Sequence, residues 1–161
     1  LAEAIAACKT WNDERFLRFG DSPWYEGVFR NNSCTQKYHW TGSYYEICSE
    51  GDSCPLCVQG NGVQKKHSFE FVLIEAGKTT PKILELPATA VARLQNIPSE
   101  RLLDSVVHVS RDGKGRDTKY SVRVVRSLTQ AERDEVEEIP LFDLDDIYSE
   151  KIRTMLAQHQ E

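Results

Sequence analysis

Alternating apolar and polar residues predict two β-hairpins in this chain. The first joins residues 66–75 to residues 82–86, and the second joins residues 106–110 to residues 118–125 through a glycine-containing loop. Strict alternation is typical of a strand with one buried face. Further aromatic, β-prone stretches lie at residues 24–29 and 38–47. We therefore expect a mainly β body of about five strands.

Helical spacing of apolar residues appears in segments outside these hairpins. Thr129 and Glu132 have the spacing of a capping box, which predicts a helix that ends before Pro140. The other expected helices cover residues 2–18, 88–96 and 147–159. The elements together suit a small, partly open Greek-key barrel.

The expected fold class is therefore mainly β (α+β), an OB-like barrel with an inserted metal-binding loop and a helical, acidic C-terminal appendage. The boundaries that we expect are an N-terminal helix over residues 1–20, an OB-like domain over residues 21–127 with the inserted loop near residues 30–62, and an acidic tail over residues 128–161.

Charge is divided unevenly along the chain. The formal net charge is -5, from 20 basic and 25 acidic residues. Residues 131–161 carry ten acids and three bases, whereas residues 63–127 carry twelve bases and seven acids. The layout is typical of a modestly basic body with an acidic partner-binding tail, although an ordinary solvated surface with an acidic helix gives the same counts.

The cysteines predict a structural zinc site. Their odd number, five, fits poorly with a closed disulfide framework. Cys54 and Cys57 have C-x2-C spacing, which presents two thiolates to one ion, and Cys48 precedes them by six residues. The fourth ligand is Cys34 or, alternatively, His39. Both sets make closed tetrahedral sites without an open position for substrate.

A redox role for the C-x2-C pair is the competing interpretation. A thioredoxin-like motif requires the pair at a strand end that opens a helix. Pro55, Gly60 and Gly62 instead indicate a loop. Structural Zn²⁺ is therefore the cofactor that we expect.

Aromatic and basic residues accompany each other through the body, which favours binding of single-stranded nucleic acid. Bases bind phosphates, and aromatic faces stack on nucleobases with little dependence on sequence. Phe69 and Phe71 share one strand face and are expected in the core instead. The candidate contact residues are Trp24, Tyr25, Arg30, Lys37, Trp40, Tyr44, Tyr45, Lys65, Lys66, Arg111, Lys114, Arg116, Lys119 and Tyr120.

Catalytic signatures are missing from the sequence. It contains no G-x-S-x-G, Walker or H-E-x-x-H motif and no constellation of paired carboxylates, so we expect a binding protein that is not an enzyme. No apolar run approaches the roughly 20 residues of a membrane span. A zinc-stabilised protein–protein interaction module is the alternative function, and an enzyme built on Asp143, Asp145 and Asp146 is the third.

The order of motifs resembles the zinc-containing single-stranded DNA-binding proteins of tailed phages. The resemblance rests on Cys34, Cys48 and the Cys54-Pro55-Leu56-Cys57 turn, then a Phe-rich strand, then the segment from Arg111 to Tyr120, and covers about residues 20–126. It implies an OB fold with an inserted zinc subdomain and cooperative, sequence-tolerant coating of single-stranded DNA in replication and recombination. A cytoplasmic location, of a host cell if the chain is phage-encoded, follows from it.

The same resemblance gives the acidic segment a function. Proteins of this family end in an acidic segment that recruits replication or recombination proteins and competes with DNA for the groove. Residues 137–146 are similar in chemistry, with acids around an apolar Pro-Leu-Phe. This chain departs from the pattern because a predicted helix follows the acids.

Overall fold

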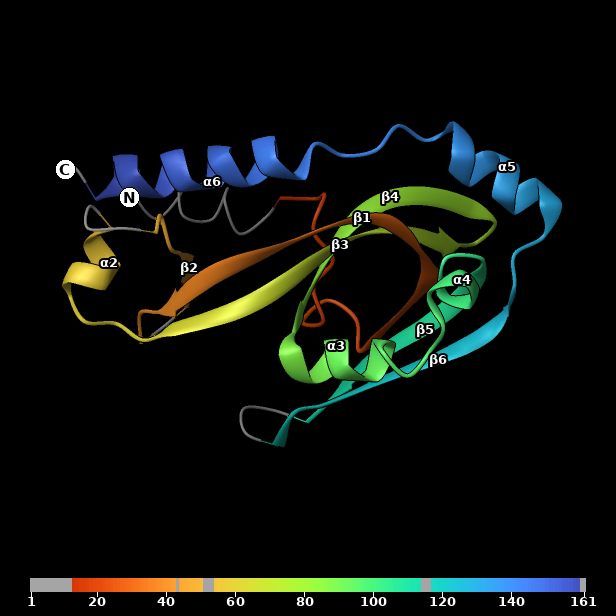
Figure 1. Cartoon of the computed structure of the whole chain (residues 1–161), viewed down its shortest axis with the longest axis horizontal. Helices are drawn as coiled ribbons and strands as arrows, with labels where there is room; N and C mark the ends of the chain where they lie inside the picture. The colour runs from red at the N-terminus through yellow and green to blue at the C-terminus, as the bar shows by residue number, and fades with distance from the viewer. Residues whose placement is uncertain (1–12, 43, 51–53, 114–116, 160–161) are drawn as a thin grey trace. The chain divides into compact units, whose positions relative to one another are not determined.

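The computed structural model describes residues 13–42, 44–50, 54–113 and 117–159 (Figure 1). Most of the helix expected over residues 2–18 lies outside the described residues. Within its described part there is no helix, because Phe16 instead forms a parallel bridge with Ile83 of a strand.

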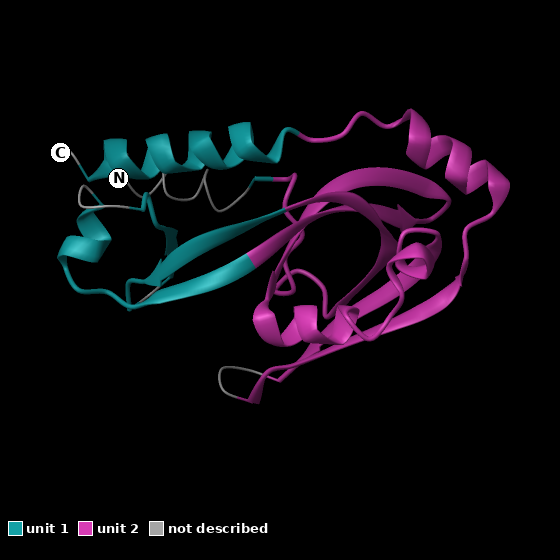
Figure 2. Ribbon diagram, in the orientation of Figure 1, with its two compact units in different colours: residues 1–13, 34–66, 143–161 teal, residues 14–33, 67–142 magenta. Residues whose placement is uncertain are grey.

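The chain divides into two compact units (Figure 2). Unit 1 combines Leu1–Asp13, Cys34–Lys66 and Asp143–Glu161, and unit 2 combines Glu14–Ser33 and His67–Phe142. The C-terminal residues, expected as a separate appendage, are therefore shared between both units.

Six described strands make one sheet. Along it the order is β4-β3-β1-β5-β6, and β2 pairs with β1. The pairs β1–β2, β1–β5 and β5–β6 are antiparallel. The strands are β1 (Trp24–Trp40), β2 (Tyr45–Ile47), β3 (Val63–Glu75), β4 (Lys78–Pro87), β5 (Ser105–Asp112) and β6 (Lys119–Ser127). Within the described residues the order ends at β4 and β6, so the sheet is open.

The mainly β, α+β fold class is confirmed, with one difference in the strands. Residues 24–29 and 38–47 were expected as separate strands, but β1 runs without a break from Trp24 to Trp40. The polar residues between the two aromatic stretches continue the strand, because a sheet face in contact with water places no demand on them for apolar side chains.

The main core of unit 2 lies between the sheet and a short helix. Phe71 of β3 is fully buried there, as predicted, and Phe69 packs partly buried against it. Helix α3 (Ala88–Leu94) adds Ala90 and Leu94. Gly27 lets β1 come close to β3, since a Cβ at this position would lie 2.2 Å from the carbonyl oxygen of Val72.

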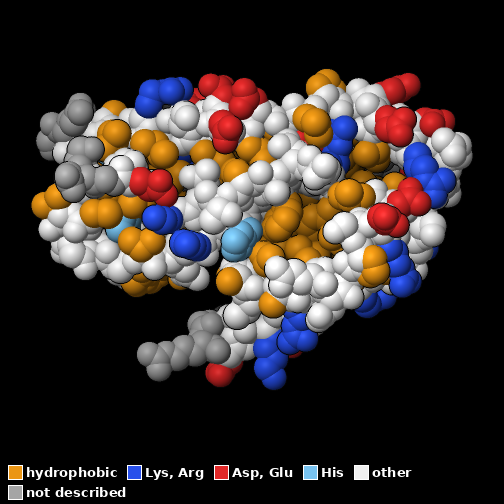
Figure 3. Space-filling view, in the orientation of Figure 1, with side chains coloured by type: hydrophobic (Ala, Val, Ile, Leu, Met, Phe, Trp, Pro, Cys, Tyr) orange, Lys and Arg blue, Asp and Glu red, His pale blue; other side chains and the backbone are white. Residues whose placement is uncertain are grey.

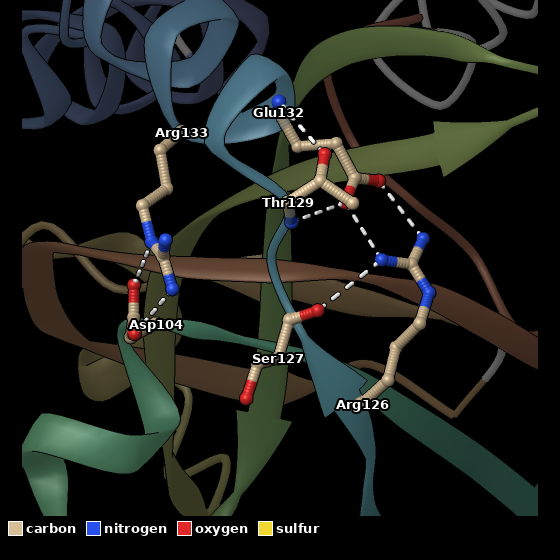
Figure 4. A network of polar contacts seen from close by, with 6 residues as sticks. All are labelled: Asp104, Arg126, Ser127, Thr129, Glu132 and Arg133. Atoms are coloured by element: carbon tan, nitrogen blue, oxygen red, sulfur yellow. Dashed lines mark hydrogen bonds and ion pairs between the residues drawn. The ribbon is translucent and has the colours of Figure 1, made fainter.

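A second apolar cluster forms where the C-terminal segment covers unit 2. Helix α5 (Gln130–Glu138) packs Val136 against this cluster. Its capping box is confirmed, because Thr129 and Glu132 exchange side-chain and backbone hydrogen bonds of 3.2 and 2.9 Å (Figure 4). The Glu132 carboxylate also accepts two hydrogen bonds from Arg126. The short helix α4 (Ser99–Leu102) precedes β5.

A buried carboxylate binds the residues that follow α5 to the sheet of unit 2. Glu70 of β3 is fully buried and accepts hydrogen bonds from Arg30 at 2.8 Å and from the Phe142 N–H at 2.5 Å. Arg30 also donates to the Ile139 carbonyl at 2.7 Å, and Asn32 donates to the Phe142 carbonyl at 2.8 Å. Side chains of β1 and β3 thus bind the backbone of Ile139 and Phe142.

The other two described helices belong to unit 1. Helix α2 (Pro55–Val58) carries the cysteine turn, and α6 (Leu144–Gln158) packs against β2. Ile147, Tyr148 and Met155 of α6 are buried. Acidic side chains gather over α5 and α6 on the face seen in Figure 3. No described helix has the length and apolarity needed to cross a membrane.

Candidate metal centre

One histidine and three cysteines of unit 1 converge. The ligand atoms of His39, Cys48, Cys54 and Cys57 all lie within 4.8 Å of one another, so this group can hold a metal ion. The Cys48 sulfur lies 3.8 Å from that of Cys54 and 3.6 Å from that of Cys57. The His39 Nε2 atom lies 3.8 and 3.4 Å from the sulfurs of Cys54 and Cys57.

These distances fit a tetrahedral zinc ion. Zn–S bonds of about 2.3 Å and a Zn–N bond of about 2.0 Å at tetrahedral angles place two sulfurs about 3.8 Å apart and a sulfur and a nitrogen about 3.5 Å apart. The four measured separations lie within about 0.3 Å of these values. Four protein ligands would close such a site and leave no position for a substrate.

His39 presents the correct nitrogen to this centre. Its Nδ1 atom lies 3.0 Å from the Asn61 carbonyl oxygen and 3.1 Å from that of Gly62. Since carbonyl oxygens only accept, Nδ1 carries the proton and donates, and Nε2 keeps its lone pair for the metal. The ring is fully buried, so its orientation is held by packing as well.

Local backbone structure positions the three cysteines. Cys48 follows β2, and its N–H donates to the Lys37 carbonyl of β1 at 2.8 Å. Cys54 is the N-cap of α2, and the Val58 and Gly60 N–H groups close the turn onto the carbonyls of Cys54 and Cys57 at 3.1 and 3.0 Å. The turn therefore presents both thiols on one side, the reason for C-x2-C spacing.

Burial and backbone donors act in opposite directions on the thiols. Burial opposes ionisation of Cys54, but the N–H groups of Cys57 and Ser49 outweigh it and lower its pKa to about 5. Burial raises the pKa of Cys48 to about 12, even though the Glu50 N–H donates to its sulfur at 3.3 Å. A bound dication would stabilise the Cys48 thiolate against this cost, because metal ligation requires the deprotonated form.

The structure groups His39, and not Cys34, with the other three ligands. Cys34 and His39 lie on the same strand, five residues apart, so the alternation of side chains directs them to opposite faces. The Cys34 sulfur lies 3.7 Å from the Gln36 side-chain nitrogen. The alternative ligand considered for the sequence is therefore the one that joins the cluster.

Two exposed aromatic rings lie one register step from His39, on the opposite face of the β1–β2 pair. Trp40 and Tyr45, 51% and 42% exposed, are register partners on β1 and β2 with ring centroids 5.0 Å apart. The neighbouring register pair contains His39. The Lys66 ammonium lies 4.2 Å from the Tyr45 ring centroid and 5.1 Å from that of Tyr38. We call Trp40, Tyr45 and Lys66 the aromatic platform.

Other residues expected to contact nucleic acid have structural partners in unit 2. Arg30 is only 13% exposed and its charge is paired with Glu70. The Tyr25 hydroxyl donates to the Arg18 carbonyl. The rings of Tyr25 and Tyr120 both pack against Phe19, with Arg111 5.6 Å from the same ring centroid.

The remaining expected contacts are divided between the two units. Lys65 and Lys119 are exposed. In unit 1, Lys37 lies 3.7 Å from the Glu50 carboxylate, and burial raises the pKa of the Tyr44 hydroxyl beside Glu46. Trp24 belongs to unit 2. Lys114 and Arg116 lie outside the described residues.

Sequence reasoning missed Glu70, the buried carboxylate that binds the C-terminal segment. In an alternating strand a glutamate beside two phenylalanines indicates the solvent face, and this face is covered by residues far away in the chain. Glu70 could have been found only through its pairing with Arg30. That pairing cannot be read from the sequence, because it depends on which strands are neighbours in the sheet.

Comparisons of the chain with models of protein families, with curated proteins and with solved structures find no match.

Proposed function

We propose that this chain is a sequence-tolerant single-stranded DNA-binding protein whose structural zinc site holds the aromatic platform. The observation that carries the proposal is the exposed pair Trp40 and Tyr45 with Lys66 over the tyrosine ring. An indole and a phenol left half in water beside an ammonium combine the two groups that bind a base and its phosphate. Each stacked base contributes about 1–3 kcal/mol, whatever its identity.

The position of the platform next to the metal ligands supports a structural role for zinc. His39 precedes Trp40 on β1, and Cys48 follows three residues after Tyr45. An ion that binds both His39 and Cys48 holds the ends of the β1–β2 pair at a fixed separation. Such preorganisation lowers the entropy cost of stacking a flexible strand on the rings.

The strand order supports an OB-like barrel as the scaffold. With β2 set aside, β1, β3 and β4 are adjacent in chain order, and β5 returns after α3 to lie beside β1. This is the Greek-key order of five strands from which OB barrels are built. In such barrels the connection between the first two strands and the hairpin between the last two bind oligonucleotides. Here the first of these connections contains β2 with Tyr45 of the platform, and the second joins β5 to β6.

The acidic segment is proposed to recruit replication or recombination proteins. The five acids of α5 lie on a surface helix, where they offer charge complementarity to a basic partner. A protein-interaction module without DNA binding is the second candidate, favoured by this helix alone. It predicts that partner capture survives loss of the platform.

Titration of a labelled oligothymidylate at several salt concentrations tests the proposal, with a duplex of equal length as the comparison. Trp40→Ala and Tyr45→Ala should each weaken single-strand binding about 5- to 150-fold, the equivalent of one stacked base. Val58→Ala removes a more exposed apolar side chain of unit 1 and should leave the affinity unchanged. Equal affinity for both forms of DNA, or unchanged affinity of the platform variants, would contradict the proposal.

A further inference from the structure

A second exposed tryptophan stands on the sheet of unit 2. Trp24 begins β1 and is 49% exposed. One face of its indole stacks on the His108 ring, with centroids 5.1 Å apart and an angle of 20° between the planes. The His108 Nδ1 atom lies 2.8 Å from a Glu26 carboxylate oxygen. Since a carboxylate only accepts, Nδ1 donates, and this bond holds the imidazole beneath the indole.

The register of three strands shows which side chains share this face. Glu26, His108 and Arg123 are neighbours across β1, β5 and β6. Two residues along the strands, Trp24, Ser110 and Ser121 are neighbours in the same way. Alternation directs the intervening residues Tyr25, Val109 and Val122 to the core face, where they belong to the main apolar cluster. The six residues named first therefore lie on the outer face.

Cationic residues continue along β6 on the same face. Lys119 and Arg123 flank Ser121 at alternate positions, and all three are exposed. The acids of this face already have basic neighbours, because Glu26 bonds to His108 and Asp112 is the register partner of Lys119. Arg123 therefore supplies a positive charge on the same face as Trp24, two strands away across β5.

We infer that this face is a second contact site for single-stranded nucleic acid. A nucleobase stacks on the open face of Trp24, and the adjoining phosphate is bound by Arg123 and Lys119, with Ser110 and Ser121 as hydrogen-bond donors. An indole stacked on one side and half exposed presents the geometry that a base requires, and guanidinium and hydroxyl groups are the ordinary phosphate ligands. His108 and Glu26 are positioning residues for the indole.

This inference rests on the proposed function but concerns different residues, in a different unit from the aromatic platform. Loss of Trp24 leaves the aromatic platform of unit 1 in place as a binding site. Loss of Trp24 should therefore weaken binding without abolishing it. Trp24 and Lys119 were among the contact residues expected from the sequence, whereas His108 was not.

Affinity measurements with oligothymidylate separate the two sites. Trp24→Ala should weaken binding about 5- to 150-fold and Trp24→Phe less. Arg123→Gln should reduce the slope of log affinity against log salt by about 0.7, the value of one phosphate contact on a single strand. Val125→Ala, an exposed apolar substitution on the same strand, is the matched control and should leave affinity unchanged.

Fluorescence gives a direct readout of stacking. In a Trp11→Phe, Trp40→Phe protein, Trp24 is the remaining indole, and oligothymidylate should quench its emission. Two results together would overturn this inference: unchanged affinity of Trp24→Ala and no quenching of the Trp24 emission. The proposed function would still stand in that case, provided that Trp40→Ala weakens binding. Absence of any oligonucleotide binding by the natural chain would instead overturn the proposed function and this inference with it.

Discussion

The buried carboxylate of Glu70 allows a quantitative test of how the C-terminal segment is held. Glu70→Gln keeps the shape of the side chain but removes the charge opposite Arg30, which is 13% exposed and 2.8 Å away. Coulomb attraction at that distance is about 6 kcal/mol at an effective dielectric constant of about 20. Desolvation of both ions offsets much of this attraction, and loss of one partner of a buried pair typically costs about 3–5 kcal/mol.

Urea denaturation, followed by circular dichroism, measures the effect. With a slope of about 2 kcal/mol per molar, a loss of 3 kcal/mol lowers the midpoint by about 1.5 M. The control is Asp104→Asn, which breaks the exposed pair between Asp104 and Arg133 and should leave the urea midpoint almost unchanged (Figure 4). Equal midpoints for both variants would refute the argument that burial makes the Glu70 pair the stronger constraint.

A double-mutant cycle identifies the origin of the loss. Arg30→Met combined with Glu70→Leu removes both charges and should be more stable than Glu70→Gln alone, because no unpaired ion remains buried. Additive effects of the two single substitutions would mean that the charges do not interact.

Three further outcomes follow from the structure. Cys54→Ser should abolish stoichiometric zinc binding measured by elemental analysis, whereas Cys34→Ser should retain about one zinc per chain; the reverse result would contradict the ligand set. Gly27→Ala should lower the free energy of unfolding by about 1–3 kcal/mol, because its methyl group would overlap the Val72 carbonyl; unchanged stability would show that β1 and β3 can separate freely. The Arg126 hydrogen bonds lower the pKa of Glu132 to about 2, so the associated stability is complete above about pH 4.5 and is lost as pH falls toward 2. Since Arg126 is exposed, we expect about 1 kcal/mol, measured as the difference between the natural chain and Glu132→Gln; a difference that does not depend on pH would contradict it.

Local signals explain which parts of the fold could be predicted. Alternation around Phe71 identified β3, and the spacing of Thr129 and Glu132 identified the start of α5, because both features depend on neighbours in the chain. The C-x2-C turn of Cys54 and Cys57 likewise places two thiols together through its own backbone.

Long-range neighbours explain the rest. The choice between Cys34 and His39 depended on which face of β1 meets the cysteine turn. The sequence does not show whether the even-numbered or the odd-numbered residues of this strand lie on that face. Glu70 became a buried ligand only because residues far along the chain cover it. The amphipathic pattern of α6 indicated an apolar face, but not that β2 packs against it.

The central claim is that the metal centre and the aromatic platform act together in binding single strands. Its most direct test is the affinity for oligothymidylate of one preparation before metal removal, after metal removal and after zinc is restored, with the metal content measured each time. Because His39 adjoins Trp40, removal should weaken binding at least about tenfold, and zinc should restore it. Equal affinity of the zinc-bound and metal-free protein would contradict the account.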